Sequence, residues 1–228
     1  MKPHAYRKTD PQRRVPWYRT GIAPLLVLFL TACTDISHEK APKAFIPDLT
    51  RLNADSSVYQ GNADFAKRPW ACVRDNKTTL VWEVKSAVAG LQNQDNTYTW
   101  YGSDRETNGG DAGKQNGGAC TGSRCDTAAY VTAVNTKRPC GFNDWRLPDR
   151  MEMSSLILPT VPFPGPTLAA EYFPNSPSAR YWTSTTFHAH ASGVWTWRFD
   201  HGYDYVAQKV ELHHVRLVRG TLDISKFK

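Results

Sequence analysis

Residues 140–153 read CGFNDWRLPDRMEM, and this stretch decides more about the fold than any other part of the 228-residue chain. Its second half, DRME (149–152), has the spacing of a capping box, in which an Asp at the N-cap and a Glu three residues later satisfy backbone N–H groups reciprocally. A helix is therefore expected to begin here, with Met151, Leu156 and Ile157 facing the core.

The start of the chain has the pattern of an export signal. Six Lys and Arg residues precede the apolar run 22–32, whose eleven residues are too few for a membrane span of about 20. The run closes in LTAC (30–33), which resembles the lipobox of bacterial lipoproteins, so we expect residues 1–32 to be removed as a signal peptide and Cys33 to be lipidated with palmitate or a similar acyl chain. An ordinary signal peptide followed by a chance Cys is the alternative, but the small residues before Cys33 favour the lipoprotein. Thr34, where an Asp would retain a lipoprotein at the inner membrane, favours the outer membrane.

Removal of this leader changes the charge of the protein. Residues 1–32 hold six of the 28 Lys and Arg residues and one of the 21 Asp and Glu residues, so the remainder has 22 against 20. A nucleic-acid-binding domain needs a dense basic face. The mature chain has no such run, and we expect no nucleic-acid partner.

The other four cysteines form an even set in an oxidising compartment, which indicates disulfides. Three pairings are possible, and the one favoured here is Cys72–Cys140 with Cys120–Cys125. The chain-entropy argument gives about 4 and about 2 kcal/mol for the long and the short loop. Zinc is the competing use of four cysteines, but no Cys-x2-Cys pair is present.

Composition divides the chain after the leader into three parts. Residues 33–68 are the lipidated Cys and a tether with scattered Pro, Ser, Asn and charge, of which AFIPDLTRL (44–52) is the part that can pack on the domain. Residues 69–221 have the length of one domain, and residues 222–228 are a tail.

Within the domain, two helices precede a strand-rich end, which predicts the α+β class. The period-two pattern of 194–200 places Trp195, Trp197 and Phe199 on one strand face, opposite Thr196, Arg198 and Asp200. The expected elements are a strand at 79–85, a long Asn- and Gly-rich loop at 92–118, a helix capped by Asp126, the helix after Asp149, and strands at 194–200, 203–209 and 215–220.

Five blocks together resemble one bacterial family, a domain of unknown function typified by the C-terminal domain of the Legionella collagen-like adhesin. The resemblance covers roughly residues 70–220, and DWRLP and YWTS are its most characteristic blocks. One departure is Thr79, where relatives often have Gly. The blocks are WACVRDNKTTLVWEVK, TYTWY with NGG and CDTAAYVTAVN, CGFNDWRLPDRMEM, EYFPNSPSARYWTST and the terminal VRLVRG.

This family is similar to C-type-lectin-like and sulfatase-modifying-factor folds, which share a WRLPT…E block. The resemblance implies that the opening stretch is a structural motif, made of Trp145, Arg146, Leu147, Pro148 and Glu152. Trp145 would pack in the core, Arg146 would fix a loop by hydrogen bonds, and Pro148 would set the start of the capped helix.

The sequence offers weak candidates for metal binding and catalysis. His188 and His190 would share a strand face, yet no third ligand stands at a defined spacing, and no Gly-x-Ser-x-Gly motif is present. We expect no metal, no cofactor, no catalytic residue and no enzyme activity. The long loop has oxygen ligands that could hold calcium, although a solvated loop has the same composition: Asp104, Asn108, Asp111 and Asn116.

A binding surface is better supported than a catalytic site, because aromatic faces stack on sugar rings and Arg matches sulfate or carboxylate. For Trp182 and Trp197 a core position is favoured, whereas for Tyr203, Tyr205 and Arg198 core-lining and ligand-binding roles stay open. The predicted ligand contacts are Tyr181, Tyr203, Tyr205 and Arg198, beside Trp182, Lys209, Arg216 and Arg219.

The sequence thus predicts an outer-membrane lipoprotein, attached to the membrane by its lipid, with a non-catalytic domain that binds a glycan or another acidic polymer. One alternative is a structural envelope protein that binds another protein. An enzyme of the sulfatase-modifying-factor type is the less favoured alternative, because its chemistry needs free thiols and the cysteines here are expected to be paired.

Overall fold

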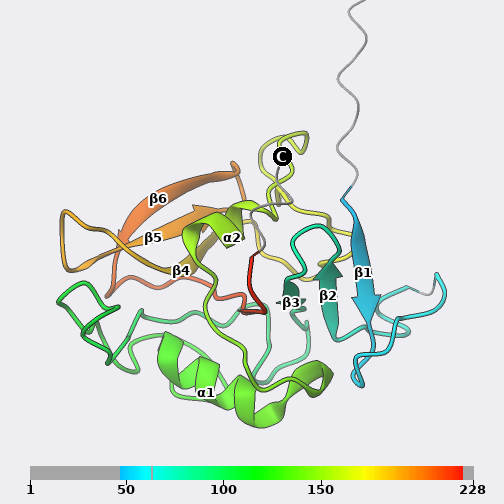
Figure 1. The fold of residues 1–228 in the computed structure, drawn as a ribbon, viewed down its shortest axis with the longest axis horizontal. Helices are drawn as coiled ribbons and strands as arrows, with labels where there is room; N and C mark the ends of the chain where they lie inside the picture. The colour runs from blue at the N-terminus through cyan, green and yellow to red at the C-terminus, as the bar shows by residue number, and fades with distance from the viewer. Residues whose placement is uncertain (1–46, 63, 223–228) are drawn as a thin grey trace, which may run out of the picture. The chain divides into compact units, whose positions relative to one another are not determined.

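A computed structural model describes residues 47–62 and 64–222, so the expected signal peptide, Cys33 and most of the tail lie outside the described residues. Two helices and two antiparallel sheets confirm the α+β class (Figure 1). The elements are β1 (Leu49–Leu52), β2 (Cys72–Asp75), β3 (Val81–Glu83), α1 (Thr127–Lys137), a 3-10 turn (Pro139–Gly141), α2 (Arg150–Ser154), β4 (Arg180–Thr186), β5 (Gly193–Arg198), β6 (Tyr203–Gln208) and β7 (Val218–Arg219).

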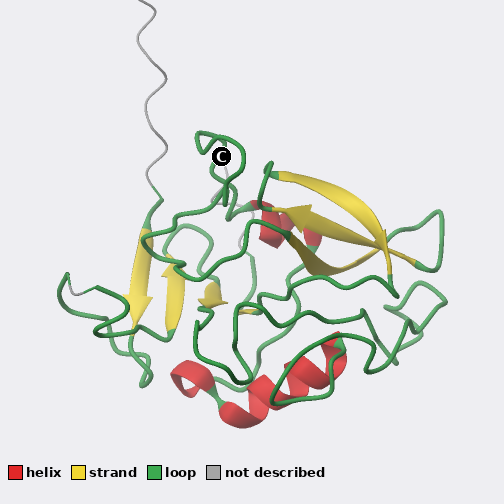
Figure 2. Ribbon diagram, turned by 180° about the vertical axis from the view of Figure 1, so that it is seen from behind, coloured by secondary structure: helices red, strands yellow, loops and turns green. Residues whose placement is uncertain are grey.

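The strands form two separate sheets, seen on opposite sides of the domain in Figure 2. One has the order β1-β2-β3-β7 and the other the order β4-β5-β6. The closing strand expected at 215–220 is reduced to two residues, and it pairs with β3 instead of the other C-terminal strands. β7, near the C-terminal end of the domain, is therefore hydrogen-bonded to β3, near its beginning.

Part of the segment 33–68 packs against the rest of the domain. β1 lies within the expected tether 33–68, yet it pairs with β2 along its whole length. Tyr59 and Phe65 then pack edge-on against Trp70, with ring centroids 5.6 and 4.6 Å away. The segment from residue 49 thus supplies a strand and core side chains to the domain, in line with the packing that the sequence allowed for residues 44–52.

Helix α1 begins and ends through local interactions. The Asp126 carboxylate accepts a hydrogen bond from a first-turn backbone N–H at 2.8 Å, and Arg138 ends the helix in the left-handed conformation. Tyr130 and Val134 are the fully buried apolar residues of the helix. These two side chains bind α1 to the core.

The opening stretch is clamped between α1 and β7. The Asn135 side-chain amide of α1 donates to Trp145 O and accepts from Trp145 N, both at 2.8 Å. Arg146 exchanges two backbone hydrogen bonds with Val218 on β7. Trp145 lies in the core at 2% exposure, so the Trp-Arg pair joins two remote parts of the chain.

Helix α2 carries the complete capping box expected from the sequence. Glu152 N donates to the Asp149 carboxylate at 2.7 Å, and the Glu152 carboxylate accepts from Asp149 N at 2.8 Å. The prediction that Met151 faces the core is wrong, because it is 66% exposed. The short helix turns Met153 inward instead, followed by Leu156.

Two disulfides staple the domain, in the pairing favoured from the sequence. Cys72–Cys140 joins β2 to the turn before Trp145 across 68 residues, and Cys120–Cys125 closes a loop of five. None of the described helices is long and apolar enough to cross a membrane.

Candidate functional site

The predicted ligand contacts Tyr203 and Tyr205 lie on β6 with 45% and 52% of their surface exposed. Arg198, on β5, pairs directly with Tyr203, and its guanidinium lies 5.8 Å from that ring. Tyr181 is misassigned as a ligand contact, since it is fully buried against Phe199. Successive strand residues face opposite sides of a sheet, and this alternation places Tyr181 on the other side.

The wider basic patch is not formed. Trp182, Lys209 and Arg216 are buried, and the Arg219 guanidinium is paired with the Asp144 carboxylate at 2.9 Å. Trp182 has the core position favoured for it, with Nε1 donating to Tyr98 O. Lys209 and Arg216 are thus buried, and Arg219 lies on β7 in the other sheet, so none of these three cations joins the two exposed tyrosines.

Arg180, which the sequence analysis missed, completes the surface around the two exposed tyrosines. It lies directly opposite Arg198 in the β4–β5 register, and its guanidinium stacks over Tyr205 at 4.7 Å. Its charged partner is Glu211, at 3.8 Å between Arg180 Nη1 and Glu211 Oε2. That separation is beyond a good hydrogen bond, so the guanidinium keeps donors for a ligand.

We call Arg180, Arg198, Tyr203 and Tyr205 the Tyr–Arg strip. All four lie on one face of β4-β5-β6, which alternates two aromatic rings with two guanidinium groups. The signal that would have identified Arg180 is the strand register. Register depends on which residues pair between strands, and it cannot be seen in the period of one strand.

Acidic side chains border the strip at both ends. The Asp200 carboxylate accepts hydrogen bonds from Arg198, and it lies 3.0 Å from His201 Nδ1. Burial alone would raise the pKa of Asp200, but its hydrogen bonds with Arg198 and His201 bring the pKa down to about 2. At neutral pH Asp200 is therefore ionised and neutralises the charge of Arg198. The Arg180 guanidinium remains available to an anionic ligand.

The opposite face of this sheet differs from the sequence prediction. Trp195 and Trp197 are half-buried, whereas Val194 and Thr196 are the fully buried residues of β5. The Arg150 guanidinium of α2 lies 3.7 Å from the centroid of the Trp195 ring. Trp197 Nε1 donates a hydrogen bond to the Arg150 carbonyl at 2.8 Å. The aromatic face is covered by a short polar helix, which explains why it is not the main core.

The long loop directs its oxygens to its own backbone and to one buried lysine. Asp104, Asn108 and Asp111 each accept a hydrogen bond from an N–H two residues later. The Lys209 ammonium donates to the carbonyls of Asn108, Asp111 and Ala191. The ammonium of Lys209 thus occupies the point where the loop carbonyls converge. Residues 47–62 and 64–222 contain no cluster of three His, Cys, Asp or Glu able to hold a metal.

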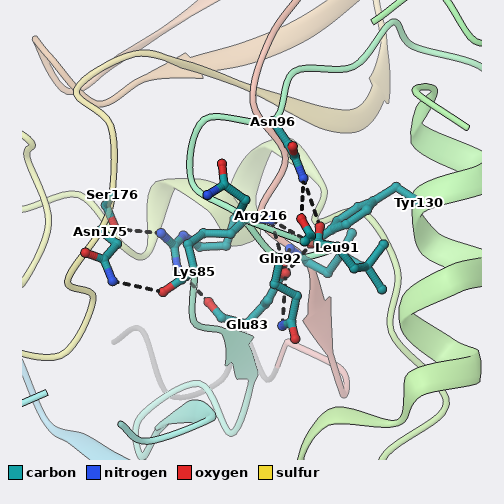
Figure 3. Close-up of polar contacts among 12 residues, drawn as sticks. Glu83, Lys85, Leu91, Gln92, Asn96, Tyr130, Asn175, Ser176 and Arg216 are labelled. Atoms are coloured by element: carbon teal, nitrogen blue, oxygen red, sulfur yellow. Dashed lines mark hydrogen bonds and ion pairs between the residues drawn. The ribbon is translucent and has the colours of Figure 1, made fainter. Parts of the chain in front are cut away.

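A second feature is a cleft of about 550 Å³ between the 65–71 segment and the 84–92 loop. Its walls are mostly apolar, and Lys85, which is 3% exposed, is one of the residues that line it. Figure 3 shows the polar network around this lysine. Lys85 Nζ donates to Glu83 Oε1 at 3.0 Å and to Tyr130 Oη at 2.7 Å, while Arg216 donates to the Glu83 carbonyl and to Ser176.

Burial and the nearby Glu83 charge shift the pKa values of two groups in this network. Burial lowers the pKa of Lys85 to about 8, although the Glu83 carboxylate acts to raise it. Burial also raises the pKa of Tyr130 well above its usual value, with Glu83 adding to the effect. Sequence reasoning missed the network, although two charged residues within the apolar run 80–85 were a visible signal.

The family model described as Lcl C-terminal domain matches residues 71–219. The chain belongs to the Lcl C-terminal domain family. No curated protein and no solved structure matches it. The expected likeness to C-type lectins therefore stays a prediction.

Within the Lcl C-terminal domain, Thr79 has an unusual backbone conformation. This residue closes the turn between β2 and β3 with φ of +66°, a conformation that suits Gly and strains a β-branched side chain. The turn itself is fixed by the Asp75 carboxylate, which accepts hydrogen bonds from the N–H groups of Lys77 and Thr78. Position 79 thus has a backbone conformation that suits Gly better than Thr.

Proposed function

We propose that this protein is a non-catalytic, adhesin-like recognition protein of the cell envelope, and that the Tyr–Arg strip binds a glycan with acidic groups. One observation carries the proposal: Tyr203 and Tyr205 are exposed on the same sheet face as Arg198 and Arg180, each ring beside a guanidinium. Membership of the Lcl C-terminal domain family supports an adhesin-like role.

The chemistry of the strip suits a sugar polymer. A tyrosine ring offers an apolar face for the C–H side of a sugar and a hydroxyl at its edge. Arg198 and Asp200 present donors and acceptors for sugar hydroxyls, and Arg180 supplies the fork that matches sulfate or carboxylate. Both rings lie on β6, two residues apart and on the same face of the sheet, so one extended sugar chain can contact both.

The test is a glycan array probed with the full chain carrying Cys33→Ser, oxidised so that both disulfides form. Acidic and sulfated glycans should bind, and salt should weaken binding because charged contacts are screened. Arg180→Ala and Tyr205→Ala should each weaken binding by roughly tenfold or more. Arg124→Ala removes an exposed arginine elsewhere and serves as the matched control.

Two results would overturn the glycan proposal. Binding that survives both strip substitutions would place the site elsewhere, and the absence of any bound glycan would reject this ligand class. Repeating the glycan array in the presence of a chelator tests the calcium alternative separately. Binding by the strip needs no metal, so loss of binding in chelator would indicate a calcium site instead.

A protein partner is the second candidate function. Val210 and Leu212 follow β6 directly and are 60% and 46% exposed, so an apolar surface adjoins the strip. If the array is negative, Leu212→Asp should abolish capture of a partner from envelope extracts. Retained capture would exclude this surface.

We also propose attachment to the outer membrane through a lipid on Cys33, which the LTAC junction supports. Metabolic labelling with palmitate should mark the wild-type protein and leave Cys33→Ser unlabelled. Membrane fractionation then places the labelled protein. Labelling of the Cys33→Ser variant, or recovery of the wild type in the inner membrane, would contradict the proposal.

A further inference from the structure

The cleft above Lys85 has the size and surface of a site for a small organic molecule. Pockets for such ligands typically enclose about 300–1,000 Å³ and have mostly apolar walls with a few polar groups, and this one encloses about 550 Å³. Its apolar walls include Phe65, Trp70, Val84 and Leu91. The cleft lies away from the Tyr–Arg strip, since its lining comes from segments 65–71, 84–92, Lys137 and Asn175.

The charged residues among the described lining are both cationic. They are Lys85, which follows β3, and Lys137, in the last turn of α1, and the lining contains no Asp or Glu. An anionic group is therefore the charged ligand that the cleft would attract, and a cationic one would be repelled.

The network beneath the cleft also has an excess of positive charge. Glu83 is the carboxylate that acts on Lys85, and a second cation, Arg216, acts on the same lysine. Both Glu83 oxygens are already occupied, since Oε1 accepts from Lys85, Gln92 and Tyr130 and Oε2 accepts from Leu217 N. Buried charge is costly unless it is paired, and Arg216 Nε has no hydrogen-bond partner in the described structure.

We propose that this cleft binds a small amphipathic carboxylate, whose apolar body lies against the walls and whose carboxylate approaches Lys85. The apolar walls account for the body of the ligand. The lysines and the uncompensated cation below account for its charge. This site is independent of the glycan proposal, because no strip residue lines the cleft.

Calorimetry with decanoate tests the proposal on the full chain carrying Cys33→Ser. Decanoate should bind with one site per chain, and decanol and decylamine should bind at least roughly tenfold more weakly. Equal binding of decanoate and decanol would show that charge plays no part. The absence of decanoate binding up to its solubility limit would reject the site.

Two kinds of variant separate the cleft from other apolar surfaces. Ala87→Trp places a large ring at the exposed rim and should abolish decanoate binding, whereas Ala191→Trp, at an exposed turn of the other sheet, should not. If Ala87→Trp leaves the affinity unchanged, decanoate binds elsewhere and the inference is wrong.

Lys85→Met removes the ammonium with little change of volume and should weaken decanoate by roughly tenfold, without changing decanol. Near-ultraviolet circular dichroism checks that this variant folds. Gln92→Glu is the second charge variant, because it adds a carboxylate to the lining while Lys85 stays in place. Unchanged decanoate affinity in Gln92→Glu would overturn the electrostatic part of the proposal, and Tyr205→Ala should bind decanoate normally whether or not the strip binds glycan.

Discussion

Arg146 and Glu152 form a two-pronged ion pair, with Nη1–Oε2 and Nη2–Oε1 distances of 2.7 and 2.6 Å. The same Glu152 carboxylate accepts the Asp149 N–H that starts α2, and Arg146 also donates to Gly220 O beside β7 at 2.7 Å. One buried carboxylate and one guanidinium thus tie the start of α2 to the end of the domain. This arrangement gives the Trp-Arg-Leu-Pro stretch its structural role.

Arg146→Lys is expected to lower the free energy of unfolding by about 2–4 kcal/mol. A lysine cannot make two parallel hydrogen bonds, so Glu152, which is 2% exposed, would keep its burial cost and lose part of its partner. Urea unfolding at pH 7 measures the change. Arg219→Lys is the matched control, because Arg219 pairs with an Asp144 side chain that is 52% exposed and should cost less than about 1 kcal/mol. Equal losses in both variants would contradict the assigned role of Arg146.

Thr79→Gly is expected to stabilise the protein by about 0.5–1 kcal/mol, because φ of +66° strains a threonine and suits glycine. The Thr79 side chain is exposed and its one hydrogen bond, to Thr221 O, is long at 3.5 Å. Thermal unfolding checks the prediction. Thr78→Gly, one residue earlier, should destabilise instead, since Thr78 is buried and its hydroxyl accepts from Leu80 N.

The sequence predicted those parts of the fold that depend on neighbouring residues. The capping box of α2, the Asp126 cap of α1 and the alternation in β5 are all local patterns. The face that β5 buries was not predictable from its own pattern. It depends on α2 covering Trp195 and Trp197 from one side while Val194 packs in the main core.

The candidate sites depend on long-range pairing, and for that reason they were only partly predictable. Tyr203, Tyr205 and Arg198 follow from composition and period, but Arg180 joins them through the β4–β5 register. Around Lys85, the partners Tyr130 and Arg216 arrive from distant segments, with Tyr130 45 residues away. A single sequence shows the charged residues in an apolar strand without showing what pairs with them.

Lys209→Met is expected to destabilise the protein by about 2–4 kcal/mol and to loosen the long loop first. Three carbonyl oxygens would lose their common donor, and an unsatisfied buried acceptor costs about 1–3 kcal/mol. Hydrogen exchange should accelerate selectively at residues 104–113. Lys114→Met, an exposed lysine in the same loop, should leave both stability and exchange unchanged. Uniform acceleration across the domain would contradict a local role for Lys209.

Removal of the two disulfides should have unequal effects. The double variant Cys72→Ala/Cys140→Ala is expected to lose about 4 kcal/mol, because this bond closes 68 residues of the unfolded chain. The double variant Cys120→Ala/Cys125→Ala should lose only about 2 kcal/mol, because the bond that it removes closes a loop of five residues. Urea unfolding of both variants provides the comparison. A larger loss from the short loop would show that native contacts, rather than chain entropy, dominate.

Stability should fall as the pH drops from 6.5 toward 4, partly through His213. Burial lowers the pKa of His213 to about 4, with Arg180 acting in the same direction, although Glu211 acts to raise it. The unfolded chain therefore binds a proton in this window that the folded protein does not, and the loss is at most about 1.4 kcal/mol per pH unit from this group.

His213→Gln should flatten the dependence of the unfolding free energy on pH between 6.5 and 4, whereas His188→Gln, at an exposed turn, should not. His214, whose pKa burial also lowers, keeps part of the slope in both variants. An unchanged slope in His213→Gln would mean that His213 becomes protonated in the folded protein, paired with Glu211 at 3.2 Å.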